Sequence, residues 1–181
     1  GYMKPKGTRL QSATGKTRDE DPMLARELLD LDAEMHELEP IVYTPTFIEE
    51  AIRGREQSDE LRERVLENYD LLSEGRDLMV LEGTDELTTG GIVDLTDPEI
   101  AELIDAKVVL ISRYDEPGDV DEILAAADQI GDNLAGVLFN AVPDSALDQL
   151  TQDVAPFLEN RGVPVLGVIP RVKELAGMSV G

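Results

Sequence analysis

The chain contains no cysteine among its 181 residues. Disulfide bridges, thiolate zinc sites and cysteine nucleophiles are therefore excluded. No apolar run approaches the roughly 20 residues that a membrane-spanning helix requires, so we predict no membrane association. The sequence also lacks Asn-x-Ser/Thr glycosylation acceptors and a signal peptide, and we expect the protein to be cytoplasmic.

Positive charge is scarce. Lys and Arg number 16 against 39 Asp and Glu, which gives a formal net charge of −23. A surface of this charge repels nucleic acid and anionic lipid, so neither is an expected partner. Many acids with few lysines favour a halophilic protein that stays soluble in concentrated salt, and the alternative is an ordinary acidic cytosolic protein. A comparison of stability in low and molar KCl distinguishes the two.

The first 18 residues differ from the rest because no acid precedes Asp19. The cations in this stretch are Lys4, Lys6, Arg9, Lys16 and Arg18. Glycine, serine and threonine residues between them would suit a bound phosphate. The alternative is a basic segment that pairs with the chain's own acids, and charge alone favours neither.

Four short, continuous apolar runs lie at residues 78–81, 108–111, 136–139 and 163–169, and residues 1–3 resemble the tail of a further strand. Such runs are typical of strands buried on both faces of a parallel sheet. Helical patterns separate them. The sequence therefore predicts an α/β fold, a doubly wound and mostly parallel sheet flanked by helices, in one domain over residues 1–181.

Several helix boundaries follow from capping patterns. Asp21 is the expected N-cap of a helix over residues 23–30, with Pro22 at its first position. A Thr46–Glu49 capping box predicts a short helix that ends at Gly54. The remaining expected helices cover residues 58–75, 96–104, 119–130 and 145–160, the last divided or kinked by Pro156.

In α/β sheets, ligands bind beyond the carboxyl ends of the strands. Glu82 follows the first apolar run directly, and a carboxylate there suits Mg²⁺ beside phosphates, although a turn or capping acid is the alternative. Asn140 follows the third run and could contact a base or ribose, but asparagine also favours turns. The last run ends at Pro170 and Arg171.

Residues 13–17 read Ala-Thr-Gly-Lys-Thr and look like the end of a Walker A loop. The G-x-x-x-x-G-K-T spacing requires glycine where Leu10 stands, and no apolar strand leads into the segment, so we do not expect a P-loop here. His36 is the single histidine and is expected at the surface. No catalytic triad is predicted.

Five segments together resemble the dethiobiotin synthetase-like branch of P-loop proteins. They read GYMKP at 1–5, DEDP at 19–22, LEGT at 81–84, GVLFNAVP at 136–143 and PVLGVIP at 164–170. Residues 106–110, 113–115 and 175–180 make the chain most similar to the N-terminal, nucleotide-binding-like domain of long phosphotransacetylases. Related archaeal proteins join this domain to a DRTGG-type domain.

The resemblance implies ATP with Mg²⁺ as the cofactor. Asp21 and Glu82 match the family's two acidic Mg²⁺ ligands, and Lys4 matches a lysine that faces the phosphates or the substrate. Asn140 matches the asparagine that reads the adenine. The expected cofactor contacts are Lys4, Thr84, Asn140, Pro170 and Arg171.

The same resemblance implies two departures. The family's first strand, Walker A loop and first helix should precede Gly1, so residues 1–181 are expected to lack them and to bind nucleotide weakly or not at all without them. Residues 84–86 read Thr-Asp-Glu where the family has a glycine-rich turn. The added acids would repel a carboxylated substrate at this turn, so we do not expect dethiobiotin synthesis.

Three functions remain open. The first is an ATP/Mg-binding regulatory module of the phosphotransacetylase N-terminal type, without acetyltransferase activity of its own. The second is a degenerate scaffold that oligomerises without binding nucleotide. The third is an ATP-dependent, carboxylate-activating ligase resembling dethiobiotin or cobyrinic acid a,c-diamide synthetase. The expected partners are a nucleotide, a C-terminal regulatory or transferase domain, and further copies of the chain in a homo-oligomer.

Overall fold

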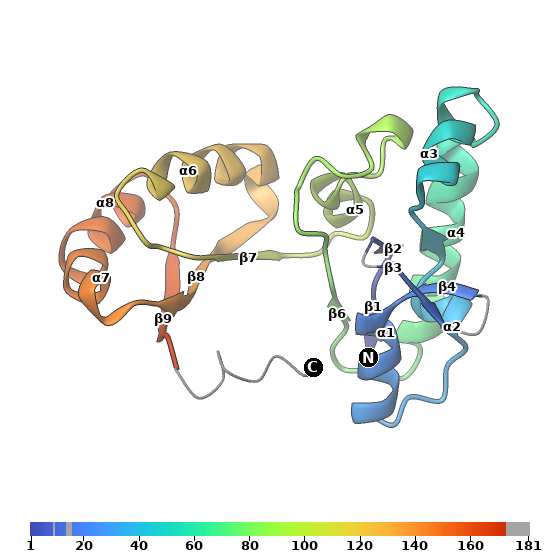
Figure 1. Cartoon of the computed structure of the whole chain (residues 1–181), viewed down its shortest axis with the longest axis horizontal. Coiled ribbons are helices and arrows are strands. Elements are labelled where there is room, and N and C mark those ends of the chain that lie inside the picture. Colours follow the sequence, from blue (N-terminus) through green and yellow to red (C-terminus); the bar gives the residue numbers. More distant parts are fainter. Residues whose placement is uncertain (9, 14–15, 173–181) are drawn as a thin grey trace. The chain divides into compact units, whose positions relative to one another are not determined.

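The computed structural model describes residues 1–8, 10–13 and 16–172, with the backbone alone for residues 10–13 and 16–18. The chain divides into two compact units, Gly1–Ile104 and Asp105–Gly181, and Figure 1 colours it along the sequence. The single domain expected over residues 1–181 stays a prediction, and each unit is described by itself.

Unit 1 carries most of the predicted polar site. Its elements are β1 (Tyr2–Met3), β2 (Lys6–Gly7), β3 (Leu10–Ala13), β4 (Lys16–Asp19), α1 (Glu20–Leu28), α2 (Met35–Leu38), β5 (Ile41–Val42), α3 (Pro45–Ile52), α4 (Ser58–Ser73), β6 (Val80–Leu81), a 3₁₀ turn (Gly91–Val93) and α5 (Asp97–Leu103). The β3 and β4 strands form an antiparallel hairpin, which the sequence did not predict.

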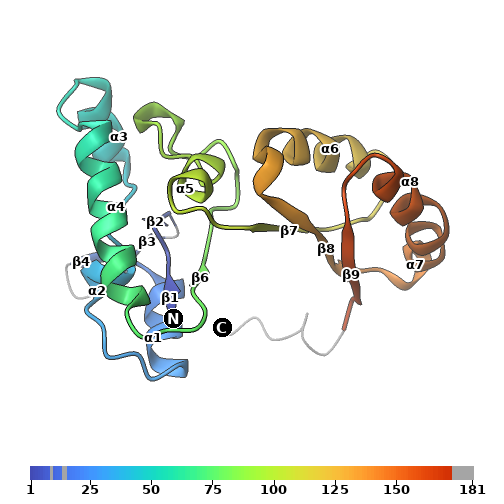
Figure 2. The same cartoon turned by 180° about the vertical axis from the view of Figure 1, so that it is seen from behind.

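One extended segment, residues 2–7, organises unit 1. Its β1 part pairs in parallel with β6, and its β2 part pairs in parallel with β5. Every residue of the segment is buried. Met3 packs in a core with Leu61 and Val65 of α4 and Ile100 of α5. Figure 2 shows α4 along its full length. Because the segment is buried between two parallel neighbours, its polar side chains need hydrogen-bond or ion-pair partners inside the protein.

Unit 2 is a three-stranded parallel sheet with helices packed against it. Its elements are β7 (Val108–Ser112), α6 (Asp119–Ile130), a 3₁₀ turn (Gly131–Asn133), β8 (Leu134–Val142), α7 (Asp144–Gln149), a π-helical turn (Leu150–Val154), α8 (Ala155–Asn160) and β9 (Val165–Pro170). The strand order is β7-β8-β9. Val137 and Phe139 of β8 share a core with Ile123 of α6 and Leu158 of α8.

The predicted α/β fold class, with parallel strands flanked by helices, is confirmed. The four apolar runs overlap β6, β7, β8 and β9, and residues 1–3 overlap β1. None of the helices in the part of the chain that the structure describes has the length and apolar content needed to cross a bilayer.

The predicted cap of the first helix is wrong. Asp19, not Asp21, is the N-cap of α1, and its side chain accepts a hydrogen bond from the backbone N–H of Asp21. Pro22 consequently stands third in the helix. The first-turn N–H groups have no intrahelical acceptor, so a proline is tolerated there as well as at the first position.

The predicted Thr46–Glu49 box is also wrong, whereas the one at Thr96 is confirmed. Thr44 is the N-cap of α3 and accepts from the N–H of Phe47, with Pro45 at the first helical position. Thr96 and Glu99 form a complete capping box on α5. The N-cap of α3 therefore lies two residues earlier than expected, at Thr44 instead of Thr46.

The division of the 145–160 helix is confirmed. The chain forms α7, then a π-helical turn over Leu150–Val154, then α8, in which Pro156 stands at the second position. Proline has no N–H to donate and its ring clashes with the preceding turn, so a regular α-helix cannot run through this point.

Candidate functional site

Three carboxylates surround one buried ammonium in unit 1. The Nζ of Lys4 lies 3.1 Å from Oδ2 of Asp19 and 3.3 Å from Oε1 of Glu82, and it donates a short hydrogen bond to Oδ2 of Asp21. Lys4 is 2 % exposed and Asp19 is fully buried. We call Lys4, Asp19, Asp21 and Glu82 the Lys4 cluster.

Backbone pairing brings these residues together. Lys4 follows β1, and its N–H donates to the carbonyl of Leu38 at 2.8 Å. Glu82 follows β6, and its N–H donates to the carbonyl of Met3 at 2.9 Å, which continues the parallel ladder. Asp21 lies in the first turn of α1. The expected meeting of polar residues beyond strand ends is therefore observed for Lys4, Asp21 and Glu82.

Asp19 is a member of the cluster that sequence reasoning missed. Its carboxylate accepts from the N–H of Thr8 at 2.8 Å and from the N–H of Asp21 at 3.1 Å, besides its contact with Lys4. One side chain thus caps α1 and also faces the buried ammonium. The available signal was its position as the first acid after the cationic stretch.

Tyr2 was missed as well. Its hydroxyl donates to Oε2 of Glu82 at 2.7 Å, while Oε1 of the same carboxylate faces Lys4. Both oxygens of Glu82 are therefore oriented by neighbours. Burial raises the pKa of Tyr2 strongly, and the hydrogen bond and negative charge of Glu82 raise it further. The phenol consequently stays protonated as a donor.

The Lys4 ammonium is held in its charged form. Burial works to lower the pKa of Lys4, but hydrogen bonds to Asp21 and Asp19 and the charge of Glu82 outweigh it. The pKa of Lys4 therefore lies above its ordinary value. A protonated lysine among three carboxylates offsets part of their negative charge and marks a point where carboxylate oxygens converge.

Two carboxylates of the cluster, those of Asp21 and Glu82, are the predicted ligands of Mg²⁺. Within residues 1–8, 10–13 and 16–172, no group of three or more histidine, cysteine or acidic side chains is arranged to hold a metal by itself. Mg²⁺ bound with a nucleotide needs less, because it keeps several waters and takes one or two carboxylates together with phosphate oxygens. Asp21 and Glu82, which reach the same ammonium, are two carboxylates that could hold such an ion.

Thr84 follows Glu82 but faces another acid. Its N–H donates to Oδ2 of Asp97 at 2.6 Å, and its hydroxyl lies 2.8 Å from the same oxygen. The Nζ of Lys6, 1 % exposed, lies 2.9 Å from Oδ1 of Asp97. The predicted cofactor residue Thr84 is thus held by a second buried lysine–aspartate pair.

In unit 2, the other predicted contacts share one end of the sheet. Asn140 is exposed near the end of β8, and Pro170 ends β9 opposite Val142. The N–H of Arg171 donates to the carbonyl of Val142 at 2.8 Å, and its guanidinium lies 3.3 Å from Oδ1 of Asp115. Asn140 and Pro170 therefore lie within the last residues of adjacent strands, not beyond them as expected, and Arg171 follows directly after β9.

The structure shows the partners of two cations in the N-terminal stretch. Lys4 and Lys6 both pair with the chain's own acids, as one of the two interpretations held. The side chains of Lys16 and Arg18 lie outside the described residues, as does Arg9. Thr14 and Gly15 of the Walker A-like segment also lie outside them, and so does the 175–180 segment. His36 is exposed on α2, as predicted.

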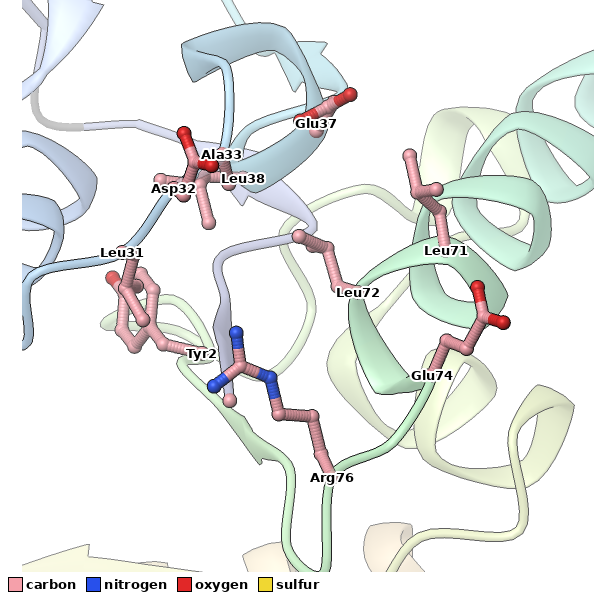
Figure 3. A pocket seen from close by; sticks show the side chains of 11 residues that line it. Tyr2, Leu31, Asp32, Ala33, Glu37, Leu38, Leu71, Leu72, Glu74 and Arg76 are labelled. Atoms are coloured by element: carbon pink, nitrogen blue, oxygen red, sulfur yellow. The ribbon is translucent and has the colours of Figure 1, made fainter.

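A pocket of about 190 Å³ lies beside the cluster (Figure 3). Tyr2 joins the two, because its ring lines the pocket while its hydroxyl reaches Glu82. Figure 3 shows the guanidinium of Arg76 directed into the space between Tyr2 and Leu72. The pocket is smaller than typical ligand cavities of 300–1,000 Å³ or so, and Lys4, Asp21 and Glu82 do not line it. The chemistry of the cluster therefore defines the candidate site.

Comparison with known families agrees with this geometry. Residues 1–179 match a family described as an AAA domain, AAA_26. The chain belongs to the AAA_26 family. This is a P-loop NTPase-like family that includes the dethiobiotin synthetase-like proteins, so the resemblance drawn from the five sequence segments is confirmed at that level. An AAA_26 domain is a nucleotide-binding type of domain, and the assignment to the phosphotransacetylase subgroup stays a prediction.

Proposed function

We propose that this AAA_26 domain is an ATP/Mg-binding regulatory module of the phosphotransacetylase N-terminal type, without acetyltransferase activity of its own. The observation that carries the proposal is the convergence of Asp21 and Glu82 on the Nζ of Lys4. Family membership supports a nucleotide as the ligand. The partner domain and the self-association expected for such a module belong to the same proposal.

Each residue of the cluster has a distinct role in this proposal. Asp21 and Glu82 would hold the Mg²⁺, which supplies positive charge to the phosphates when bound. Lys4 stays protonated between them and would offer an N–H to a phosphate oxygen once the Mg²⁺ takes over the carboxylates of Asp21 and Glu82. Tyr2 and Asp19 orient Glu82 and Lys4, so the donors are in place before a ligand arrives.

We propose, independently of the Lys4 cluster, that three residues of unit 2 contact a nucleoside. The amide of Asn140 has both a donor and an acceptor, which matches the edge of an adenine. Pro170 and Arg171 neighbour it through the pairing of β8 and β9. For these three residues the proposal of a nucleotide contact rests on their chemistry and on the family resemblance alone.

The loop that follows Glu82 favours nucleotide binding alone over the ligase alternative, in which a carboxylate substrate is activated. Asp85 and Glu86 are both exposed there, and their charges oppose the approach of a carboxylate or a mixed anhydride. The N–H of Thr84, the nearest backbone donor, is already engaged by Asp97. A carboxylated substrate would therefore meet repulsion at this loop.

The test is calorimetric titration of the protein, with any residues that its reading frame places before Gly1, with MgATP. We expect saturable heat at or below millimolar nucleotide, and at least a tenfold loss of affinity in Glu82→Gln, about 1.4 kcal/mol. Glu102→Gln is the matched control, because Glu102 is an exposed acid on α5.

The alternatives are outcomes of the same experiment. Absence of heat, together with identical melting with and without MgATP, contradicts the proposal and favours the scaffold. Phosphate release that requires an added carboxylic acid contradicts it in favour of a ligase. Acetyl transfer between phosphate and coenzyme A by the chain alone would also contradict it.

A further inference from the structure

A second buried ion pair lies behind the loop that follows Glu82. Asp97 receives three donors on one carboxylate. The N–H of Thr84 reaches Oδ2 at 2.6 Å, the hydroxyl of Thr84 reaches the same oxygen at 2.8 Å, and Nζ of Lys6 reaches Oδ1 at 2.9 Å. One backbone N–H, one hydroxyl and one ammonium are a complete donor set for a carboxylate.

The backbone at Gly83 approaches this carboxylate closely. A Cβ at Gly83 would lie 2.8 Å from Oδ2 of Asp97, so the glycine allows the oxygen to approach the backbone closely. Lys6 is fixed from the other side, with its Nζ 2.7 Å from the carbonyl of Thr89 and 2.5 Å from the carbonyl of Leu95. The ammonium is thus held in place independently of Asp97.

We infer that Gly83, Thr84 and Lys6 form a carboxylate-binding site, and that Asp97 occupies this site in cis. Asp97 is the first residue of α5, so its carboxylate reaches the donors from a neighbouring element rather than from the loop itself. The inference goes beyond nucleotide binding and does not depend on it.

Occupation by Asp97 determines what Thr84 offers to any other ligand. The Thr84 hydroxyl has a single proton, and its two nearest acceptors are Oδ2 of Asp97 and, at 2.9 Å, the carbonyl of Glu86. Its oxygen therefore remains only as an acceptor. An external carboxylate gains the N–H and hydroxyl of Thr84 only when it displaces Asp97, so the contact acts as a built-in inhibitor of carboxylate binding.

The test is chemical rescue of Asp97→Ala by formate, which reproduces the missing carboxylate. Melting temperatures are compared in sodium formate and in sodium chloride of equal concentration. We expect formate to raise the melting temperature of Asp97→Ala by about 5 °C more than chloride does. Wild type should respond equally to the two salts, because its site is filled.

Three variants make the test specific. Asp97→Asn keeps a side chain in the site, so we expect it to be destabilised but not rescued. Adding Lys6→Met to Asp97→Ala removes the ammonium and should abolish the rescue. Glu102→Ala, an exposed change on the same helix, should behave as wild type.

Several results would overturn the inference. They are an equal response of Asp97→Ala to both salts, a formate-specific rise in wild type, and failure of Asp97→Ala to fold in either salt while Asp97→Asn folds. Hydrogen exchange of wild type gives a result even where neither variant folds. Protection of the Thr84 amide is expected because it donates to Asp97, and exchange at the rate of an open loop contradicts the site.

Discussion

Asp21 and Glu82 reach the same atom, the Nζ of Lys4, although one begins a helix and the other follows a strand far along the chain. Parallel pairing of β1 with β6 places Lys4 beside Glu82, and the cap at Asp19 places Asp21 beside both. The functional account of this domain depends on that convergence.

Removal of the ammonium should destabilise unit 1. In Lys4→Met the fully buried Asp19 loses its contact with Nζ and faces Asp21 and Glu82. We expect the free energy of unfolding in urea to fall by about 3 kcal/mol, because an uncompensated buried charge remains. The loss should shrink as salt is added, since Asp21 and Glu82 are partly exposed.

Lys107→Met is the matched control for this change. Lys107 is exposed, and its Nζ donates to the carbonyl of Asp132 at 3.0 Å. Its substitution should cost less than about 0.5 kcal/mol. Equal losses in Lys4→Met and Lys107→Met would contradict a structural role for the cluster.

Tyr2→Phe should change how stability depends on pH. Burial and Glu82 raise the pKa of Tyr2 above its ordinary value of 10.0, so the folded protein retains a proton that the unfolded chain loses. The free energy of unfolding of wild type therefore falls as pH rises above 10. Without the phenol this fall should be less steep, by up to about 1.4 kcal/mol per pH unit.

Other groups with shifted pKa values affect the stability of wild type and of Tyr2→Phe in the same way. Burial also raises the pKa of Tyr43 and Tyr114, which adds to the fall, and burial lowers the pKa of Lys6, which opposes it. Urea unfolding at pH 8 to about 11 measures the difference between wild type and Tyr2→Phe. Parallel curves across that range would refute the assignment of a protonated Tyr2.

Gly90→Ala should disturb the loop that precedes α5. Gly90 has φ of 99° and a Cβ there would lie 2.3 Å from the carbonyl oxygen of Leu95, which also accepts from Lys6. We expect a loss of about 3 kcal/mol, part from the positive φ and part from the clash.

Gly75→Ala separates those two parts. Gly75 has φ of 69°, and a Cβ there would meet no atom within 4 Å. This variant should lose about 1 kcal/mol, from the positive φ alone. The measurement is thermal or urea unfolding of both variants, and similar losses would show that the Leu95 contact does not restrict the loop.

Much of the sheet could be predicted from the sequence. The strands β7, β8 and β9 are continuously apolar, so each appeared as a run of hydrophobic residues. Burial on both faces was expected for all three, but only β8 contains buried residues, and Val109, Ile111 and Leu166 are exposed. β2 did not, because it is two residues long and contains Lys6, and a buried lysine contradicts the usual polarity rule. Its ion pair with Asp97 and its hydrogen bonds to the carbonyls of Thr89 and Leu95 make that burial possible.

Part of the candidate site could be predicted from the family resemblance. The resemblance supplied Lys4, Asp21 and Glu82, whereas Asp19 and Asp97 have the ordinary appearance of acids at helix starts. Both do occupy helix starts, and their second contacts, with Lys4 and Lys6, depend on tertiary packing. A local capping pattern carries no information about such distant partners.

The most direct test of the account is titration of the nucleotide-bound protein with Mn²⁺, a paramagnetic substitute for Mg²⁺, followed by electron paramagnetic resonance. The account predicts that Asp21→Asn and Glu82→Gln each weaken Mn²⁺ binding about tenfold or more, while Glu102→Gln does not. The double variant should lose less than the sum of the two, since both acids contact one ion. Unchanged Mn²⁺ affinity in both single variants would contradict the account.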